Sequence, residues 1–198
     1  MARTDRQKIF EVFESLVSRY GLDKVTMKDL AREAGISVGS IYTHFRNKDA
    51  LIVAVEEKWC GHVQQRNASI IASDATSEEK LAKILVEHIE LFSTLIRQDR
   101  AAYEMMVGAI QLRYIKRNLT DTRKEVFDAM IAGTTQVIAE GQEKGEFEVE
   151  DVEVTARLFV RAFAEYFSPG EVIRKEHEEV VQSAQDMFEL LMNAVRTR

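Results

Sequence analysis

Residues 26–51 constrain the fold more strongly than any other part of the chain. They read TMKDLAREAGISVGSIYTHFRNKDAL. Thr26 is placed to cap a helix, and Asp29 stands at the reciprocal position of a capping box. Gly35 supplies a left-handed turn at the end of that helix. The apolar residues between them recur at helical spacing: Leu30, Ala31 and Ala34.

A second short helix is predicted directly after this turn. Ser37 is a good cap for a helix running to about His44, and Ile41 and Phe45 point inward at helical spacing. Its outer surface then carries Val38, Gly39, Ser40, Tyr42, Thr43 and His44. Such a helix is short and small-sided enough to enter the major groove of DNA, so the pattern predicts a helix-turn-helix.

The run GISVGSIYTHFRNKDAL closely resembles the helix-turn-helix signature of the TetR (tetracycline repressor) family of bacterial transcription regulators. The residues that carry the resemblance are in register: Gly35, Ser37, Gly39, Tyr42, Phe45, Lys48 and Leu51. The resemblance covers the first quarter of the chain, and the remainder resembles the family in length and helical pattern. Val12 and Phe13 depart from it, since many members carry small residues there.

Several side chains are predicted to contact DNA. Because Ile41 and Phe45 take the inward positions, the Tyr42 hydroxyl is expected at a phosphate; a core aromatic is the alternative. The resemblance implies that Lys48 holds the DNA backbone, where the alternative is an ordinary solvated lysine. The candidate DNA-binding residues are Thr26, Lys28, Ser37, Val38, Gly39, Ser40, Tyr42, Thr43, His44 and Lys48.

The charge distribution agrees with a DNA-binding end on an acidic body. The net charge of −6 by itself argues against a nucleic-acid binder, because phosphate neutralisation supplies most non-specific affinity. Residues 1–50, however, hold nine Lys or Arg against seven Asp or Glu, which leaves −8 for the rest. This balance favours a protein that binds DNA through one end.

Bulk properties predict a cytoplasmic protein. No apolar stretch approaches the roughly 20 residues that a membrane span requires, and the first residues do not resemble a signal peptide. Cys60 is the only cysteine, which excludes an intrachain disulfide and agrees with a reducing compartment.

The whole chain is predicted to be all-α, with about nine helices. We expect a three-helix DNA-binding domain in residues 1–47 and an effector-binding and dimerisation domain in residues 48–198. Asn47 caps a fourth helix of some 20 residues, about 30 Å long, which links the two. The later helices are expected at residues 81–95, 101–112, 121–144, 152–167 and 172–195, with a break at residues 168–170 around the only proline.

The last two predicted helices carry broad apolar stripes. They suit either the core of a bundle or a dimer interface, and the resemblance favours dimerisation through a four-helix bundle with a second copy. The candidate dimerisation residues are Phe159, Tyr166, Ala184, Met187, Phe188 and Leu191.

Aromatic and methionine side chains could line an effector pocket, although an apolar core would contain the same residues. The resemblance implies a small-molecule pocket, and the expected effector is hydrophobic or amphipathic. The candidate ligand-binding residues are Trp59, Phe92, Tyr103, Met106, Tyr114, Phe127, Met130 and Phe163.

Catalytic and metal sites are not expected. Cys60 and His62 lie two apart on a helix and face different ways, and His88 and His177 have no partner at ligand spacing. The sequence contains no phosphate loop, nucleophile elbow or HExxH motif, so we expect neither an enzyme nor a cofactor.

Together these features predict a homodimeric, ligand-responsive repressor that binds a pseudo-palindromic operator in double-stranded DNA. Two alternatives remain. The first is a ligand-independent activator or architectural DNA binder. The second is a helical enzyme or interaction bundle with a vestigial DNA-binding head.

Overall fold

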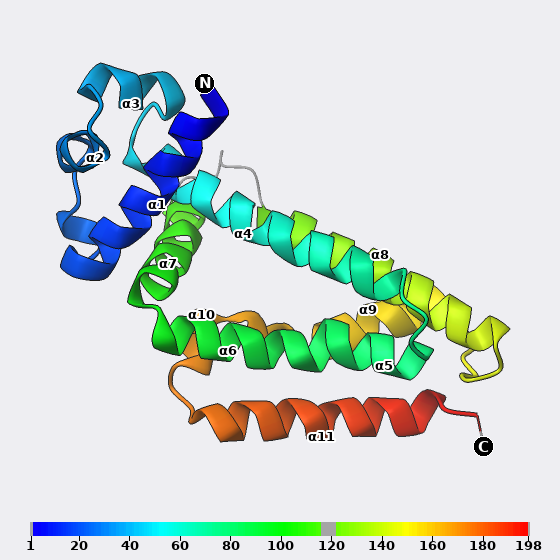
Figure 1. The fold of residues 1–198 in the computed structure, drawn as a ribbon. Helices are drawn as coiled ribbons and strands as arrows, with labels where there is room; N and C mark the ends of the chain where they lie inside the picture. Colours follow the sequence, from blue (N-terminus) through cyan, green and yellow to red (C-terminus); the bar gives the residue numbers. More distant parts are fainter. Residues whose placement is uncertain (1, 116–121, 198) are drawn as a thin grey trace. The chain divides into compact units, whose positions relative to one another are not determined.

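The computed structural model describes residues 2–115 and 122–197, and it describes side chains for residues 6–112 and 124–197. Figure 1 shows an all-α chain, which confirms the predicted fold class. The first elements are α1 (Ala2–Tyr20), the 3₁₀ turn η1 (Leu22–Lys24), α2 (Met27–Ala34), α3 (Val38–His44) and α4 (Lys48–Ile71). They are followed by α5 (Ser77–Ala82), the π-helical turn η2 (Lys83–Glu87), α6 (His88–Gln98), α7 (Arg100–Ile115) and α8 (Thr122–Glu143). The last are α9 (Val152–Ala162), the 3₁₀ turn η3 (Ala164–Phe167), α10 (Pro169–Val172) and α11 (His177–Val195).

The chain forms two compact units. One, called the head here, comprises Met1–Trp59 and Leu95–Thr120; the other, the body, comprises Cys60–Thr94 and Asp121–Arg198. The helix α4 supplies residues to both units. The head therefore includes α7, although the body segment Cys60–Thr94 separates α7 from the rest of the head in the sequence. The division into functional domains at residue 47 stays a prediction.

Local capping positions the helices of the head. Thr26 and Asp29 form the predicted capping box at the start of α2, and Gly35 ends that helix with a φ of 66°. Ser37 caps α3 by accepting from the amide of Ser40, and Asn47 accepts from the amide of Ala50 at 2.8 Å in the first turn of α4. These bonds satisfy amides that no helical carbonyl can reach.

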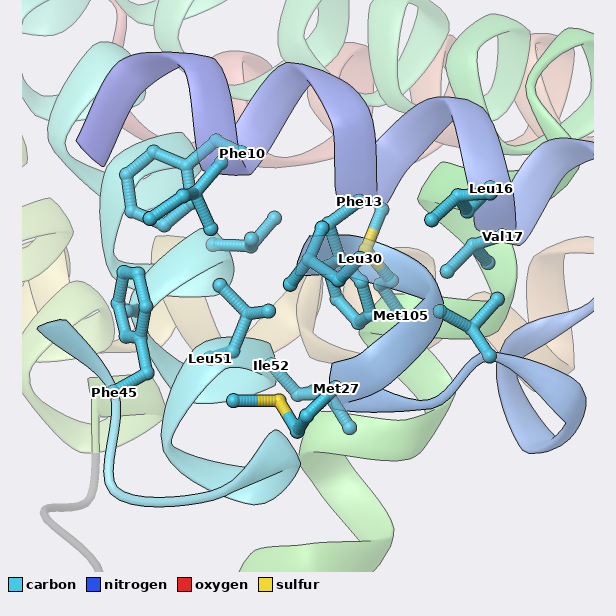
Figure 2. Packing of buried hydrophobic residues seen from close by; sticks show 14 of the residues in the cluster. Phe10, Phe13, Leu16, Val17, Met27, Leu30, Phe45, Leu51, Ile52 and Met105 are labelled. Atoms are coloured by element: carbon cyan, nitrogen blue, oxygen red, sulfur yellow. The ribbon is translucent and has the colours of Figure 1, made fainter. Parts of the chain in front are cut away.

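The core of the head is built from α1 to α4 and also from α7 (Figure 2). Phe13 lies at its centre beside Leu30, and Met105 of α7 packs in the same cluster. Gly108 of α7 lies close to η1, and a Cβ on it would lie 2.6 Å from Cδ2 of Leu22, so an alanine there would require the Leu22 side chain to move. The expected three-helix core is therefore completed by a helix that comes much later in the sequence.

The body is held by α5, η2, α6, α8, α9 and α11. Lys80 is buried and pairs with Glu140 at 2.9 Å, joining α5 to α8. Near the C-terminus, Arg196 makes ion pairs with Glu78 at 2.6 Å and with Glu189 at 3.1 Å. No helix among the described residues is sufficiently long and apolar to traverse a membrane.

Two predicted boundaries near the C-terminus are wrong. The helix expected over residues 172–195 begins only at His177, and the one expected over residues 152–167 is α-helical only as far as Ala162 before continuing as η3. Pro169 begins the short helix α10, because its fixed φ suits the first helical position, where an amide hydrogen has no helical partner.

Candidate nucleic-acid interface

The helix α3 buries one side in the head and exposes the other. Ile41 and Phe45 are buried, whereas Tyr42 is 51% exposed. Lys28 on α2 is also exposed. The remaining predicted DNA contacts on and around α3 are exposed or half-buried: Thr26, Ser37, Val38, Gly39, Ser40, Thr43 and His44. The structure thus brings these side chains to the surface of the head.

Several hydroxyl groups of this surface form hydrogen bonds within α3 or with its cap. The Ser37 hydroxyl accepts from the Ser40 amide at 3.0 Å and lies 2.8 Å from the Ser40 hydroxyl. The Thr43 hydroxyl donates to the carbonyl oxygen of Ser40 at 2.7 Å. Thr26 is similarly engaged, since its hydroxyl donates to Asp29 at 2.6 Å and holds the pKa of that carboxyl below its usual value. Ser37 and Thr26 therefore shape the interface as caps.

Gly39 has no packing reason to be a glycine. The nearest atom to a Cβ built on it is the Ser37 hydroxyl oxygen at 3.6 Å, an ordinary contact. The position is exposed on the outer side of α3. A bare backbone there leaves room for a partner to approach closely from outside.

Lys48 has a structural role inside the head. Its ammonium donates to the carbonyl oxygen of Leu22 and, at 3.4 Å, to that of Asp23, so it ties the start of α4 to η1. Burial lowers the pKa of this ammonium, while Asp23 and Asp49 oppose the shift. Glu104 of α7 completes the arrangement by accepting from the amide of Leu22 at 2.5 Å. The predicted contact between Lys48 and the DNA backbone stays a prediction.

Arg6 belongs to the same surface and was missed in the sequence. Its guanidinium lies over the rings of Phe10 and Phe45, at 5.6 Å and 5.5 Å from their centroids. Phe45 is the C-terminal cap of α3, and Figure 1 shows the start of α1 beside that helix. The spacing of four between Arg6 and Phe10 was the one available signal, but the contact with Phe45 is tertiary. A fixed positive charge thus flanks α3.

Comparison with known proteins decides the family. A model of the bacterial regulatory proteins of the tetR family matches residues 9–55, and a model of the tetracyclin repressor-like C-terminal domain matches residues 77–188. The chain belongs to the TetR family. It is a DNA-binding transcription regulator, and α3 of this TetR-family chain stands at the recognition position of the helix-turn-helix.

Individual relatives of this TetR-family regulator are distant but of full length. The fatty acid metabolism regulator protein of Bacillus subtilis is 22% identical over 197 residues, which are 99% of this chain and 98% of that protein. A TetR-family regulator from Mesorhizobium loti has the same fold, with a TM-score of 0.74, 18% identity, and coverage of 100% and 99% of the two chains. The structure of FadR from Bacillus subtilis in complex with stearoyl-CoA matches with a TM-score of 0.65 and 19% identity, over 94% of this chain and 97% of that one.

The body of this TetR-family chain contains a cavity of about 310 Å³ between the second half of α4 and α8. Met130 lines it and is the only predicted ligand-binding residue with a described side chain that does. Apolar side chains such as Val63, Ile71 and Ile84 form much of the wall. Three amide side chains complete it: Gln64, Asn67 and Gln136.

The other predicted ligand-binding residues are not gathered in this cavity. Trp59 packs against the core of the head, and Phe163 is fully buried in the body beside Tyr166. Phe127 is half-buried against Phe167, with ring centroids 5.8 Å apart. Phe92, Tyr103 and Met106 are half-buried elsewhere, and the side chain of Tyr114 lies outside the described residues. Among the described side chains of this set that lie outside the cavity, Phe163 alone is core and the others are half-buried, so their role in ligand binding stays a prediction.

The predicted dimerisation residues are mostly inside the single chain. Phe159, Tyr166, Ala184 and Phe188 are buried, and Met187 and Leu191 are half-buried. The large apolar side chains that α9 and α11 expose include their neighbours Leu158 at 58% and Leu190 at 66%, and Val154 at 45%. The four buried residues pack within the single chain, and the role of the whole set at a dimer interface stays a prediction.

Within the described residues, no group of three His, Cys, Asp or Glu side chains is placed to hold a metal ion. Cys60, the only cysteine of the sequence, is half-buried.

Proposed function

We propose that this TetR-family regulator is a homodimeric repressor that α3 anchors in the major groove of a pseudo-palindromic operator, and that a small molecule bound in the body releases it. The observation that carries the DNA part is the outer side of α3. It offers small polar side chains around Gly39, where the structure has no internal use for a glycine.

Different side chains of this surface are assigned to the DNA phosphates and to the bases. Tyr42 and Lys28 are exposed, and we assign them to phosphates, which position the protein without specifying a sequence. Val38, Ser40, Thr43 and His44 are assigned to base edges and thymine methyl groups. In a symmetric dimer the two copies of α3 would enter successive major grooves about 34–36 Å apart.

The proposed dimer uses the exposed sides of α9 and α11. Leu158 and Leu190 are large apolar side chains in open solvent, and covering them with a second copy removes that area from water. The full-length likeness to TetR-family chains supports this choice of helices.

The proposed effector site is the cavity between α4 and α8. Its lining residues on α4 lie between Val63 and Ile71, and the same helix continues back to Lys48 in the head. A ligand that moves this part of α4 therefore acts on an element that also belongs to the head. The solved complex of a structural neighbour with stearoyl-CoA supports a small-molecule effector. Switching requires the ligand to prefer the released form, by about 10⁴-fold for complete release.

The proposal is tested by selecting genomic DNA fragments on the purified protein and sequencing them. We expect a small set of fragments that share an inverted repeat with half-sites one helical turn apart. Retention of random fragments would contradict the operator model, and failure to retain any DNA would favour the vestigial-head alternative. If no small molecule weakens binding to a selected fragment, the ligand-independent alternative replaces the repressor model.

A further inference from the structure

The cavity between α4 and α8 has an unusual charge balance for this protein. Charged residues make up 30% of the chain, yet none of the described side chains that line the cavity is ionisable. Among these side chains, polar character comes from the amides Gln64, Asn67 and Gln136. An ion moved from water into such a site would lose hydration without gaining a counter-charge.

Two charged pairs lie beside the cavity. Arg66, next to Asn67 on α4, donates to Glu87 at 3.2 Å and to the carbonyl oxygen of Lys83 at 3.1 Å. On α8, Lys124 pairs with Asp128 at 3.4 Å. A charged ligand would compete with these existing pairs for its counter-charge.

One atom of the lining is left without a hydrogen bond. The side-chain oxygen of Asn67 is buried and has no hydrogen-bond partner among the described residues, although the residue lines the cavity. A ligand that covers this acceptor leaves it unpaired, at a cost of about 1–3 kcal/mol, unless the ligand itself donates a hydrogen bond to it.

We propose that this cavity selects an uncharged, mainly apolar molecule that carries a hydroxyl or amide N–H donor, and that Asn67 is the residue that recognises the donor. The inference rests on the proposed function, because it names the ligand class of the proposed effector site. The volume of about 310 Å³ is at the lower end for ligand pockets, which suits a small molecule or one segment of a longer one.

Four probes of equal chain length test the charge and the donor separately: 1-octanol, octanoate, octylammonium and methyl octyl ether. Calorimetry on the full chain should show binding of 1-octanol, with the two ions at least tenfold weaker. The ether has the same chain but no donor, so we expect it to bind about three- to tenfold more weakly than the alcohol, the range of one hydrogen bond.

The Asn67→Leu variant should remove the preference for the alcohol over the ether. Gln65→Leu is the matched control, since Gln65 is an exposed neighbour on α4 outside the lining, and it should keep the preference. If Asn67→Leu does not fold, the preference of the wild-type protein among the four probes decides the matter alone.

Tighter binding of either ion, equal binding of ether and alcohol, or no binding of 1-octanol at millimolar concentration would overturn the inference. Release of a selected genomic fragment is measured in parallel. If 1-octanol binds with the expected preferences but does not weaken DNA binding, the ligand class stands and the switching part of the proposed function fails.

Discussion

The guanidinium of Arg6 lies 5.5 Å from the ring centroid of Phe45, so the first helix of the head holds a positive charge against the end of the recognition helix. The stacked position restricts a side chain that would otherwise sample many rotamers. If α3 enters the major groove as proposed, a charge fixed beside it is well placed for a neighbouring phosphate.

The Arg6→Gln variant should bind selected and random DNA several-fold more weakly, and its salt dependence should fall by about one counterion. Lys8→Gln is the control, because it removes an equal charge from the exposed surface of the same helix without a contact to Phe45. Fluorescence anisotropy between about 50 and 200 mM salt measures both effects. Equal losses in the two variants would show that only net charge matters.

The Gly39→Ala variant should separate folding from DNA binding. An alanine meets no close neighbour at this position and replaces the poorest non-proline helix former, so the free energy of unfolding should rise by about 0.5–1 kcal/mol. Operator affinity should fall instead, because the methyl group stands where DNA approaches the backbone. Urea unfolding and anisotropy test the two parts, and unchanged affinity would remove Gly39 from the interface.

The Lys48→Ala variant should lower the stability of the head by about 1–3 kcal/mol, since it leaves the Leu22 carbonyl without its donor. Urea unfolding followed by circular dichroism measures this. The same variant tests the predicted phosphate contact: a salt dependence lower by about one counterion supports it. Loss of stability with an unchanged salt dependence would leave Lys48 with a structural role only.

His88 should make the stability of the body depend on pH. Burial lowers its pKa to about 4, with a smaller contribution from Arg66, and its ring lies 5.5 Å from that of Phe167. Between pH 6.5 and 4, the unfolded chain therefore binds a proton at His88 that the folded chain does not bind. The contribution of His88 to the free energy of unfolding is fully present above pH 6.5 and falls as the pH drops towards 4. The expected loss is on the order of 3 kcal/mol. His88→Phe should flatten this pH dependence in thermal unfolding, and an unchanged profile would assign it to other groups.

The Leu158→Glu and Leu190→Glu variants should dissociate the dimer with little effect on folding, because both side chains are exposed in the single chain. Sedimentation at micromolar concentration should show the wild-type protein at twice its 22.7 kDa chain mass and the variants at one chain mass. Phe159→Glu should instead unfold the body, since Phe159 is 2% exposed. A wild-type monomer would contradict the dimer.

The parts of the fold that depend on short-range signals were predictable. The caps at Thr26, Ser37 and Asn47 and the turn at Gly35 act within four residues, so the sequence contains the whole signal. The exposed side of α3 followed for the same reason, because Ile41 and Phe45 define its inner side.

The parts of the fold and of the candidate sites that depend on contacts between residues distant in sequence were not predictable. An apolar stripe identifies a helix that packs, but not which of its members contact the same chain, so it could not tell that Phe159 is buried in the single chain and Leu158 is exposed. Arg6 reaches Phe45 only across the folded head. The cavity required knowledge of which residues of α4 and α8 lie opposite each other, and among the ligand candidates with described side chains Met130 alone lines it.

The placement of α7 in the head limits how this protein can be recombined. The head core needs Met105, and η1 is tied to Glu104, yet both residues are encoded after a body segment that ends at Thr94. A hybrid regulator that joins residues 1–59 to a foreign effector domain would therefore carry an incomplete core, with Phe13 and Leu30 missing a covering partner. Substitution of the outer residues of α3 should therefore be sufficient to change the DNA specificity of this chain. An N-terminal segment transferred to another protein should be soluble only when α7 is transferred as well.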